Sequence, residues 1–578
     1  MTGRTKTSAL AGLLLALGGC YSGASVSAES SAQTDGAAEP SGGGGGDAGT
    51  DGETDGNADG GSGDPAESCL DGLEPRALQR LSATQARNTL RDLFGVPDLE
   101  ITYADETDPI TELGVRQLRS SADAVLAVRD AWAEDVFGCD TAGEPNDACA
   151  EDFIRRFGTR TFRRPITDSE VDTLMSVYES AAYGEQLSFA DSLDVVLSTM
   201  LQSPSFIYVL EDGAAVTDVD GVVLELDGHT LASRLSYFLW NTMPDDALFA
   251  AAEAGELATP QGLEQQVERM LASPQAEDRL RSLVTKWLHI DGAGLRLVLE
   301  DAIKDPDLYP EFSPALLAAM RVEVNALVDR ALSSGDSGFD ELLMSREAYV
   351  NASLAELYGV QGPADDESWA WVTLPSEERA GILTRGAFLA VHSGQRVQSP
   401  IARGVYVLEE VMCAELGEPP PTANDTPIEP GMDDPKGPLT VRELVEVRTM
   451  DNTTCAACHA LINPTGYLFE HYDALGRWRT TEVHSGLQID AEGKLTLGDV
   501  AGPMVDAVKL SESLVDSGDA RACFAKRWAQ TALDTESFDS CTEEEVVTAF
   551  VETGDVRALL AGIVRSPAFR YARVGGEE

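Results

Sequence analysis

The chain has 578 residues, of which 43% are hydrophobic and 6% aromatic, so it is long enough for several folded domains with ordinary cores. Its 98 acidic and 42 basic residues give a formal net charge of −56. Such a charge repels polyanions, so we expect no nucleic-acid partner and no electrostatic attraction to an anionic membrane.

Residues 1–20 are typical of a lipoprotein signal peptide. Arg4 and Lys6 precede an apolar run, residues 9–17, which is too short to remain as a membrane span. The sequence LGGC, which ends at Cys20, resembles a bacterial lipobox and implies that Cys20 carries lipid; an ordinary cleaved signal with an incidental cysteine is the alternative. We therefore predict an exported protein, lipid-anchored at the cell envelope, on the outer membrane or the cell surface, that touches the membrane only through this lipid.

Residues 21–68 indicate a flexible acidic tether. They are rich in Gly, Ser, Ala, Thr, Asp and Glu and include no Lys or Arg, so they cannot bury a core. No later stretch has the length and apolarity of a membrane span.

The body after the tether shows mainly helical patterns. Ser or Thr is followed three positions later by Glu or Gln at Ser82/Gln85, Thr167/Glu170, Thr440/Glu443 and Thr542/Glu545, which predicts capping boxes. Apolar residues recur at helical spacing in Val171, Leu174, Met175 and Tyr178, and again in Phe189, Leu193, Val196 and Met200. Strand-like alternation is confined to short segments around 221–226 and 369–374. We predict a mainly α multidomain protein with an N-terminal helical domain over 69–150 and a middle helical domain over 222–360.

An internal repeat is visible in three blocks that recur in the same order. FIRRFGTRTF (153–162) is similar to FAKRWAQTAL (524–533), a predicted capping box follows in both copies, and VVLSTMLQSPSFIYV (195–209) is similar to ALLAGIVRSPAFRYA (558–572). Chance similarity of amphipathic helices explains one block but not three in order. The pattern predicts a duplicated helical unit, with copies over 151–212 and 495–578.

The sequence CAACH places two cysteines and a histidine at Cys455, Cys458 and His459. Two thiols three positions apart can both bond to the vinyl groups of a haem, and the adjacent histidine then faces the iron. The pattern predicts covalent haem c on these three residues, with His459 as an axial iron ligand. A redox pair, a zinc site and a structural disulfide are the alternatives; they lack, respectively, a thioredoxin-like βαβ pattern, a second ligand pair and a role for His459.

The residues around this motif carry a family resemblance. CAACHALINPTGYLFEHYDALGRWR (455–479) resembles the signature of the planctomycete-type cytochrome C proteins. RLSATQARNTLRDLFGV (80–96), FGTRTFRRPITDSEV (157–171) and LASRLSYFLWNTMPDDAL (231–248) resemble the planctomycete-specific helical domains of that family, and 381–413 is similar to the start of its cytochrome-like segment. The resemblance implies this domain architecture and a c-type haem, with an embedded cytochrome c-like haem segment over 375–490.

The chain departs from the family pattern at three places. Asn463-Pro464 stands where the family has Asp-Pro, the segment before the motif contains Met450 but no His, and the last domain reads TALDTESFD without the usual Gly-Arg. The second departure leaves the sixth iron ligand open. Met450 or Met504 is a candidate, and the further candidates are His392, Met432, His471 and His484.

Residues near the motif are suited to hold a haem in place. Arg477 and Arg479 match the geometry of haem propionates; pairing with local acids such as Glu470 is the alternative. A backbone carbonyl of Asn463 or Pro464 is expected to accept a hydrogen bond from the outer ring nitrogen of the motif histidine and to fix its orientation.

The nine cysteines need an assignment each, because the predicted compartment is oxidising. Lipid takes Cys20 and haem takes two, which leaves an even six. We expect local disulfides between Cys139 and Cys149 and between Cys523 and Cys541, while the pairing of Cys69 with Cys413 follows only by elimination.

Three functions fit these observations. The first is electron transfer at the cell envelope with an unknown redox partner. The second is a surface binding or scaffolding protein, for polysaccharide for example, with a structural haem; the third is a peroxidase-like haem enzyme with an open iron site. No other catalytic motif is present, so we assign no catalytic residue and leave open whether the protein is an enzyme.

Overall fold

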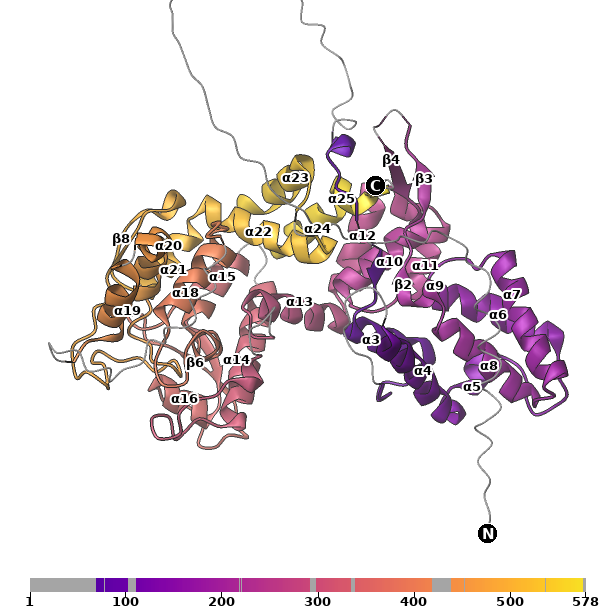
Figure 1. Ribbon diagram of the computed structural model, residues 1–578, viewed down its shortest axis with the longest axis horizontal. Coiled ribbons are helices and arrows are strands. Elements are labelled where there is room, and N and C mark those ends of the chain that lie inside the picture. The colour runs from indigo at the N-terminus through magenta and orange to yellow at the C-terminus, as the bar shows by residue number, and fades with distance from the viewer. Residues whose placement is uncertain are drawn as a thin grey trace, which may run out of the picture. The chain divides into compact units, whose positions relative to one another are not determined.

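A computed structural model describes residues 69–76, 78–101, 111–217, 219, 221–291, 298–333, 338–417, 438–451, 453–535 and 537–574. The predicted signal peptide, Cys20, the tether and Met432 lie outside these ranges. Contacts divide the chain into Met1–Ser62 and Gly63–Glu578, and every described residue belongs to the second unit. The predicted mainly α fold is confirmed (Figure 1). In the described ranges, no helix is long and apolar enough to cross a bilayer.

The first hydrophobic core joins the segments that we predicted as an N-terminal domain and as the first repeat copy. It is built from α3 (Ala83–Phe94), α4 (Glu112–Ala127), α5 (Ala133–Phe137), α6 (Asp147–Phe162), α7 (Asp168–Glu179), α8 (Phe189–Leu201) and α9 (Pro204–Ile207). The predicted capping boxes of Ser82 and Thr167 begin α3 and α7. The predicted apolar faces of α7 and α8 are buried, with Met175 partly so, and these faces hold the helices together.

The second hydrophobic core is continuous from the middle of the chain to its C-terminal helices. Its first part contains α10 (Gly228–Leu239), α11 (Asp246–Glu253), α12 (Pro260–Leu271), α13 (Pro274–Trp287), α14 (Pro314–Ser333), α15 (Gly338–Met344) and α16 (Ala352–Tyr358). The predicted haem segment contributes α17 (Gly386–Val391), α18 (Pro400–Tyr406) and η6 (Val407–Val411) to this core. It also contains α19 (Val441–Met450) and α20 (Thr453–Tyr467), which contribute to a separate small apolar cluster. The chain then continues through α21 (Ala507–Val515), α22 (Gly518–Leu533), α23 (Ser540–Val551), α24 (Val556–Arg565) and α25 (Pro567–Arg570).

The strands form small antiparallel sheets that tie distant parts of the chain together. The pairs are β1 (Gln79–Arg80) with β2 (Tyr208–Val209), β5 (Glu347–Val350) with β6 (Ala370–Thr373), and β7 (Gly493–Leu495) with β8 (Gly502–Met504). A three-stranded sheet has the order β3 (Gly213–Ala215), β4 (Val222–Leu226), β9 (Tyr571–Val574), with Val222 opposite Val574. The two predicted strand segments are confirmed as β4 and β6, and β4 anchors the C-terminal end of the described chain.

The repeat has the same succession of elements in both copies. α6, α7, α8, α9 and β2 correspond to α22, α23, α24, α25 and β9, and the three long helices of each copy pack together (Figure 1). The first helix of each copy ends at a residue in the left-handed conformation, Arg163 with φ 59° and Asp534 with φ 48°. The prediction that Thr542 begins α23 is wrong. Asp539 caps this helix by accepting a hydrogen bond from the backbone N–H of Thr542, because the helix already starts at Ser540.

The second copy has Asp534 at the position where the first copy has Arg163, and the hydrogen bonds around these positions explain the difference. In the first copy, the guanidinium of Arg163 donates to the carbonyl oxygens of Ser205, Phe206 and Tyr208. The equivalent carbonyls in the second copy, at 568 and 569, accept from Arg234 of α10 and, at 568, also from Arg76. Asp534 can therefore stand at the position of Arg163 without leaving these buried acceptors unpaired.

Three disulfides use the six cysteines outside Cys20 and the CAACH motif. The predicted Cys139–Cys149 bond is confirmed, but the other two pairings are wrong: the bonds are Cys69–Cys541 and Cys413–Cys523. Cys523 lies ten residues before the end of α22, roughly 15 Å along the helix axis, whereas Cys541 lies in the first turn of the next helix. Bonded cysteines need Cα atoms within about 7 Å, so neighbours in the sequence were poor partners here.

Candidate functional site

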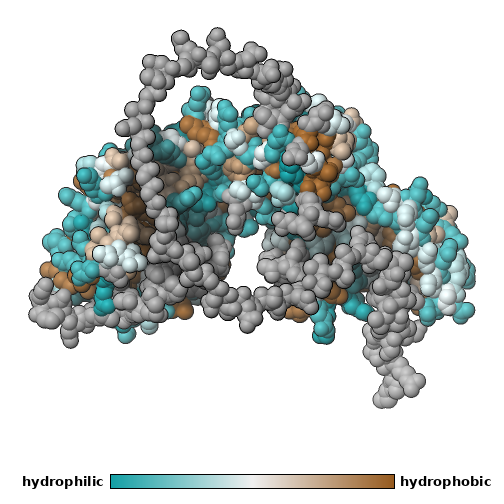
Figure 2. Space-filling view, turned by 45° about the horizontal axis from the view of Figure 1, so that its top comes forward, coloured by the Kyte–Doolittle hydropathy of each residue, from teal (hydrophilic) through white to brown (hydrophobic). Residues whose placement is uncertain are grey.

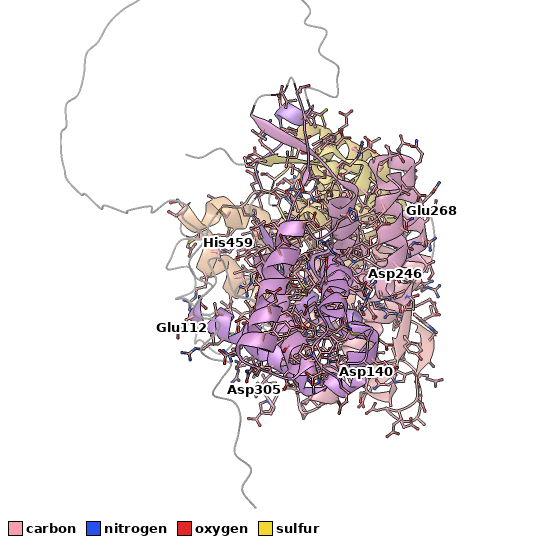
Figure 3. The ribbon with its side chains drawn as sticks, turned by 90° about the vertical axis from the view of Figure 1, so that its right-hand side faces the viewer. Glu112, Asp140, Asp246, Glu268, Asp305 and His459 are labelled. Atoms are coloured by element: carbon pink, nitrogen blue, oxygen red, sulfur yellow. A yellow bond between two sulfur atoms is a disulfide. The ribbon has the colours of Figure 1, made fainter. Side chains whose placement is uncertain are left out.

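Helix α20 presents the CAACH motif on one side. Cys455, Cys458 and His459 occupy positions i, i+3 and i+4, which share one face of a helix. Cys458 is exposed, and Cys455 and His459 are half-buried. The labelled His459 can be followed in Figure 3, where it lies on the pale orange helices at the side of the molecule. The motif is therefore accessible from solvent in this structure.

The opposite side of α20 is fixed by packing. The helix contacts α18, α19 and β7, and a small apolar cluster of Val397, Val441, Val445, Tyr467 and Ile401 lies beneath it. A Cβ atom added at Gly466 would lie 1.9 Å from the carbonyl oxygen of Pro400, and one added at Gly404 would lie 2.4 Å from that of Ile462. Glycines at these two positions let the backbones of α18 and α20 cross at close range.

The ring of His459 is oriented by a short hydrogen-bond relay. Its Nδ1 lies 2.8 Å from Oδ1 of Asn463, whose Nδ2 donates to Oγ1 of Thr449 at 2.8 Å. Thr449 in turn donates its only hydroxyl proton to the carbonyl oxygen of Val445. The hydroxyl of Thr449 can thus only accept from Asn463, so the amide oxygen faces the histidine and Nδ1 must carry the proton.

In a neutral ring, the proton on Nδ1 places the lone pair of His459 on Nε2, the nitrogen that points away from Asn463. A neutral imidazole protonated at Nδ1 is the form that binds a metal through Nε2. We predicted a backbone carbonyl of Asn463 or Pro464 in this role. The side chain of Asn463 takes it instead, since the backbone carbonyls of residues inside a helix point along the helix axis and not toward the ring.

The described cysteines fall into two groups, free thiols in the CAACH motif and disulfide-bonded cysteines elsewhere. Cys455 and Cys458 are free thiols, while the other described cysteines are all in disulfides. Within the described residues, no group of three or more His, Cys, Asp and Glu is placed to hold a metal ion. Cys455 and Cys458 are not bonded to each other, which differs from the structural-disulfide alternative.

The candidates for a sixth iron ligand lie in different environments. Met450 is 39% exposed at the end of α19, which packs against α20, whereas Met504 of β8 is buried in the second core. The candidate histidines each contact a backbone carbonyl oxygen: His392 that of Leu288, His471 that of Arg479 and His484 that of Arg396. Met450 is the candidate whose side chain is accessible on a helix next to the motif.

The two arginines predicted for propionates have protein partners. Arg477 forms ion pairs with Asp473 at 2.9 Å and Glu311 at 2.8 Å, and Arg479 donates to Oε1 of Gln398 at 2.6 Å. For Arg477 this is the alternative that we weighed, pairing with a local acid. A role of either residue toward a haem stays a prediction.

A group of buried polar residues in the same segment was not predicted. Arg403 is fully buried and donates to four backbone carbonyl oxygens, those of Leu389, Phe469, Tyr472 and Asp473. It thereby fixes the turn after α20 to α17 and α18. Both partners are visible in the sequence, as the arginine of SPIARGVY and the acidic-aromatic stretch LFEHYD. Neither pattern indicates that this arginine binds backbone carbonyl groups.

The side-chain amide of Gln398 lies between two buried carboxyl groups, those of Glu470 and Glu482, close to Arg403. Nε2 of Gln398 lies 3.0 Å from Glu470 and 3.4 Å from Glu482, and both acids are 1% exposed. Burial, with a further contribution from the nearby Glu482, raises the pKa of Glu470 to about 7, although the hydrogen bond from Gln398 and the charges of Arg479 and Arg403 oppose the shift.

Glu470 is therefore expected to make stability depend on pH. Its pKa is 4.5 in the unfolded chain and about 7 in the fold, so the fold binds this proton more tightly. The stabilisation is complete below about pH 4.5 and is lost as the pH rises through about 7. Urea unfolding across this range measures the free energy of unfolding. As the pH rises, that of the wild type should fall by on the order of 1–3 kcal/mol relative to that of Glu470→Gln, which cannot ionise. Parallel pH profiles of the two proteins would contradict the shifted pKa.

Comparisons with known proteins assign most of these segments to named families. Residues 149–211 match the PSD5 family, described as a protein of unknown function (DUF1595), and residues 226–360 match PSD4, a protein of unknown function (DUF1592). Residues 379–482, which include CAACH, match PSCyt3, a protein of unknown function (DUF1588). None of the curated proteins and none of the solved structures matches the chain. The three families cover just over half of the chain and are those that its motifs resemble, so the chain belongs to the planctomycete-type cytochrome C proteins with planctomycete-specific helical domains.

Proposed function

We propose that this chain is an exported, lipid-anchored c-type haem protein that transfers electrons at the cell envelope. The observation that carries the proposal is the combination on α20 of two free thiols and a histidine whose Nδ1 is held by Asn463, with Nε2 left to bind iron. The match of residues 379–482 to a cytochrome c-type domain family supports it. Export and lipidation rest on the sequence of residues 1–20.

The residues present fit a covalently attached haem. The Sγ atoms of Cys455 and Cys458 would hold it by thioether bonds, and Nε2 of His459 would bind its iron. The bound group would supply one-electron redox chemistry. Asn463 and Thr449 keep the ring of His459 in the required orientation, and the crossing at Gly404 and Gly466 keeps α20 rigid against α18.

Covalent attachment is tested by producing the chain with a cytochrome c maturation system and staining a denaturing gel for haem. The wild type is expected to stain, and Cys455→Ser/Cys458→Ser to show no stain, because no thioether can form. Thr453→Ser, which changes an exposed residue of α20 outside the motif, is the matched control and should stain like the wild type. A folded wild type that does not stain after maturation would overturn the proposal.

The optical spectrum of the purified protein separates electron transfer from peroxidase-like chemistry. A six-coordinate haem with His and Met ligands favours electron transfer, and an open iron site favours reaction with small molecules. We expect the first, with Met450 as the sixth ligand, so Met450→Ala should abolish the Met-ligated spectrum while covalent haem is retained. Met504→Ala is the comparison that identifies the ligand if Met450→Ala leaves the spectrum unchanged.

A further inference from the structure

A cavity of about 370 Å³ lies where the two repeat copies and the middle helices meet, and five basic side chains contribute to its lining. Its walls come from β1, α3, α10, α13 and the end of α22, and the four helices are labelled in Figure 1. The charged residues that line it are Arg76, Arg80, Arg234, Arg279, Lys286 and Asp534. A second cavity of about 760 Å³ shares Lys286, Thr531 and Asp534 with the first, so the two adjoin.

This concentration of positive charge is unusual for the molecule. The whole chain carries a net charge of −56, and hydrophilic residues cover much of the described part of the face shown in Figure 2. The cavity nevertheless gathers five of the 42 basic residues and one carboxylate. A second carboxylate, Glu211, forms an ion pair with Arg234. The lining of the cavity thus carries more basic than acidic side chains.

Arg279 shows the imbalance most directly. Its side chain is 8% exposed, and its Nε donates to the carbonyl oxygen of Phe238 at 2.9 Å. No described carboxylate forms an ion pair with it, and burial is the single cause that lowers its pKa, to about 10. The guanidinium thus remains charged at neutral pH. Buried charges in proteins are normally paired, because an unpaired one costs several kcal/mol.

Arg76 is a second buried guanidinium in the lining. Arg76 donates to the carbonyl oxygen of Ala568, and burial followed by repulsion from Arg234 lowers its pKa to about 10. Asp534 accepts a hydrogen bond from the side chain of Gln79. In the adjoining cavity, the indole N–H of Trp528 is buried and has no hydrogen-bond partner in the described structure, so it is a further donor at the wall.

We infer that this cavity binds an organic or inorganic anion whose carboxylate, phosphate or sulfate oxygens pair with Arg279 and the guanidinium groups around it. Planar guanidinium groups match such oxyanions bidentately. A volume of about 370 Å³ suits a ligand of metabolite size. The inference does not depend on haem, because the cavity contains no residue of the CAACH segment.

Thermal unfolding and calorimetric titration of the full chain test the inference, with citrate, inorganic phosphate and inorganic sulfate as separate probes at matched ionic strength. At least one anion should raise the Tm of the wild type, and the probe that does so identifies the oxyanion class. Arg279→Gln should weaken its binding about tenfold or more, since a charge-assisted pair is lost. Arg281→Gln, two residues further along α13, should bind as the wild type does, because Arg281 pairs with Asp329 instead.

Thr531→Glu is a second variant that keeps the test informative if Arg279→Gln does not fold. Thr531 lines both cavities, and its hydroxyl donates to a backbone carbonyl at the surface, so the fold should accept the change. The new carboxylate would occupy the place of the ligand and should abolish the anion-dependent rise in Tm. Absence of any anion-specific stabilisation of the wild type, or equal affinity in wild type and both variants, would overturn the inference.

Discussion

Gly466→Ala is expected to destabilise the protein by about 3 kcal/mol or more, at the upper end of the cost of overpacking a core. The added Cβ would lie 1.9 Å from the carbonyl oxygen of Pro400, and the atoms in the way are backbone atoms of α18 that no side-chain rotation can move. The two helices would have to separate, which removes the support of α20 under the CAACH motif. Urea unfolding of the purified chain gives the change in free energy.

Gly143→Ala is the matched control for this experiment. A Cβ at Gly143 meets no atom within 4 Å, and the residue lies exposed in a loop, so the change should stay within about 0.5 kcal/mol. Equal effects of the two substitutions would show that the close crossing of α18 and α20 is not a structural requirement.

Arg385→Met is expected to cost about 3–5 kcal/mol, because it leaves a buried carboxylate without its counter-charge. Arg385 and Glu323 are 0% and 1% exposed, and Nη1 of the arginine lies 3.3 Å from the carboxylate. The arginine also donates to the carbonyl oxygens of Ser345 and Glu347, and the acid accepts from the hydroxyl of Tyr358. The pair joins α14 to the helix that begins the predicted haem segment.

The double variant Arg385→Met/Glu323→Leu separates charge from packing. Removing both partners should cost clearly less than the sum of the two single changes, because no unpaired charge then remains in the core. Lys509→Met, which breaks an exposed pair with Glu512, should change stability by less than about 1 kcal/mol. If thermal or urea unfolding shows that the double variant loses as much stability as the two single variants together, the buried ion pair is not the cause.

Local patterns were enough to predict the helices and the repeat. The capping boxes at Ser82, Thr167 and Thr440 begin helices as expected, because the cap depends on residues only three positions apart. The repeat blocks predicted two helical units with the same element order. The exception, Thr542, arose because Asp539 offers an equally good cap three residues earlier, and propensity alone does not rank two adjacent caps.

Long-range partners could not be predicted in the same way. The pairing of Cys69 with Cys541 spans 472 residues, and only the fold of the whole unit brings them together. The basic cavity likewise draws its arginines from β1, α10 and α13, which no sequence window contains. At the motif itself, the sequence predicted a backbone carbonyl of Asn463 or Pro464 as the partner of His459, whereas the side chain of Asn463 makes the contact.

The bond between Cys69 and Cys541 also has a consequence for how the folded chain responds to proteolysis. It closes a covalent ring that includes nearly the whole described chain, and the other two disulfides lie within or across that ring. A protease that cuts one exposed loop between these cysteines opens the ring but releases no fragment. A nicked molecule would therefore stay in one piece, still joined to its N-terminal segment, until a second cut or a reductant separates the parts.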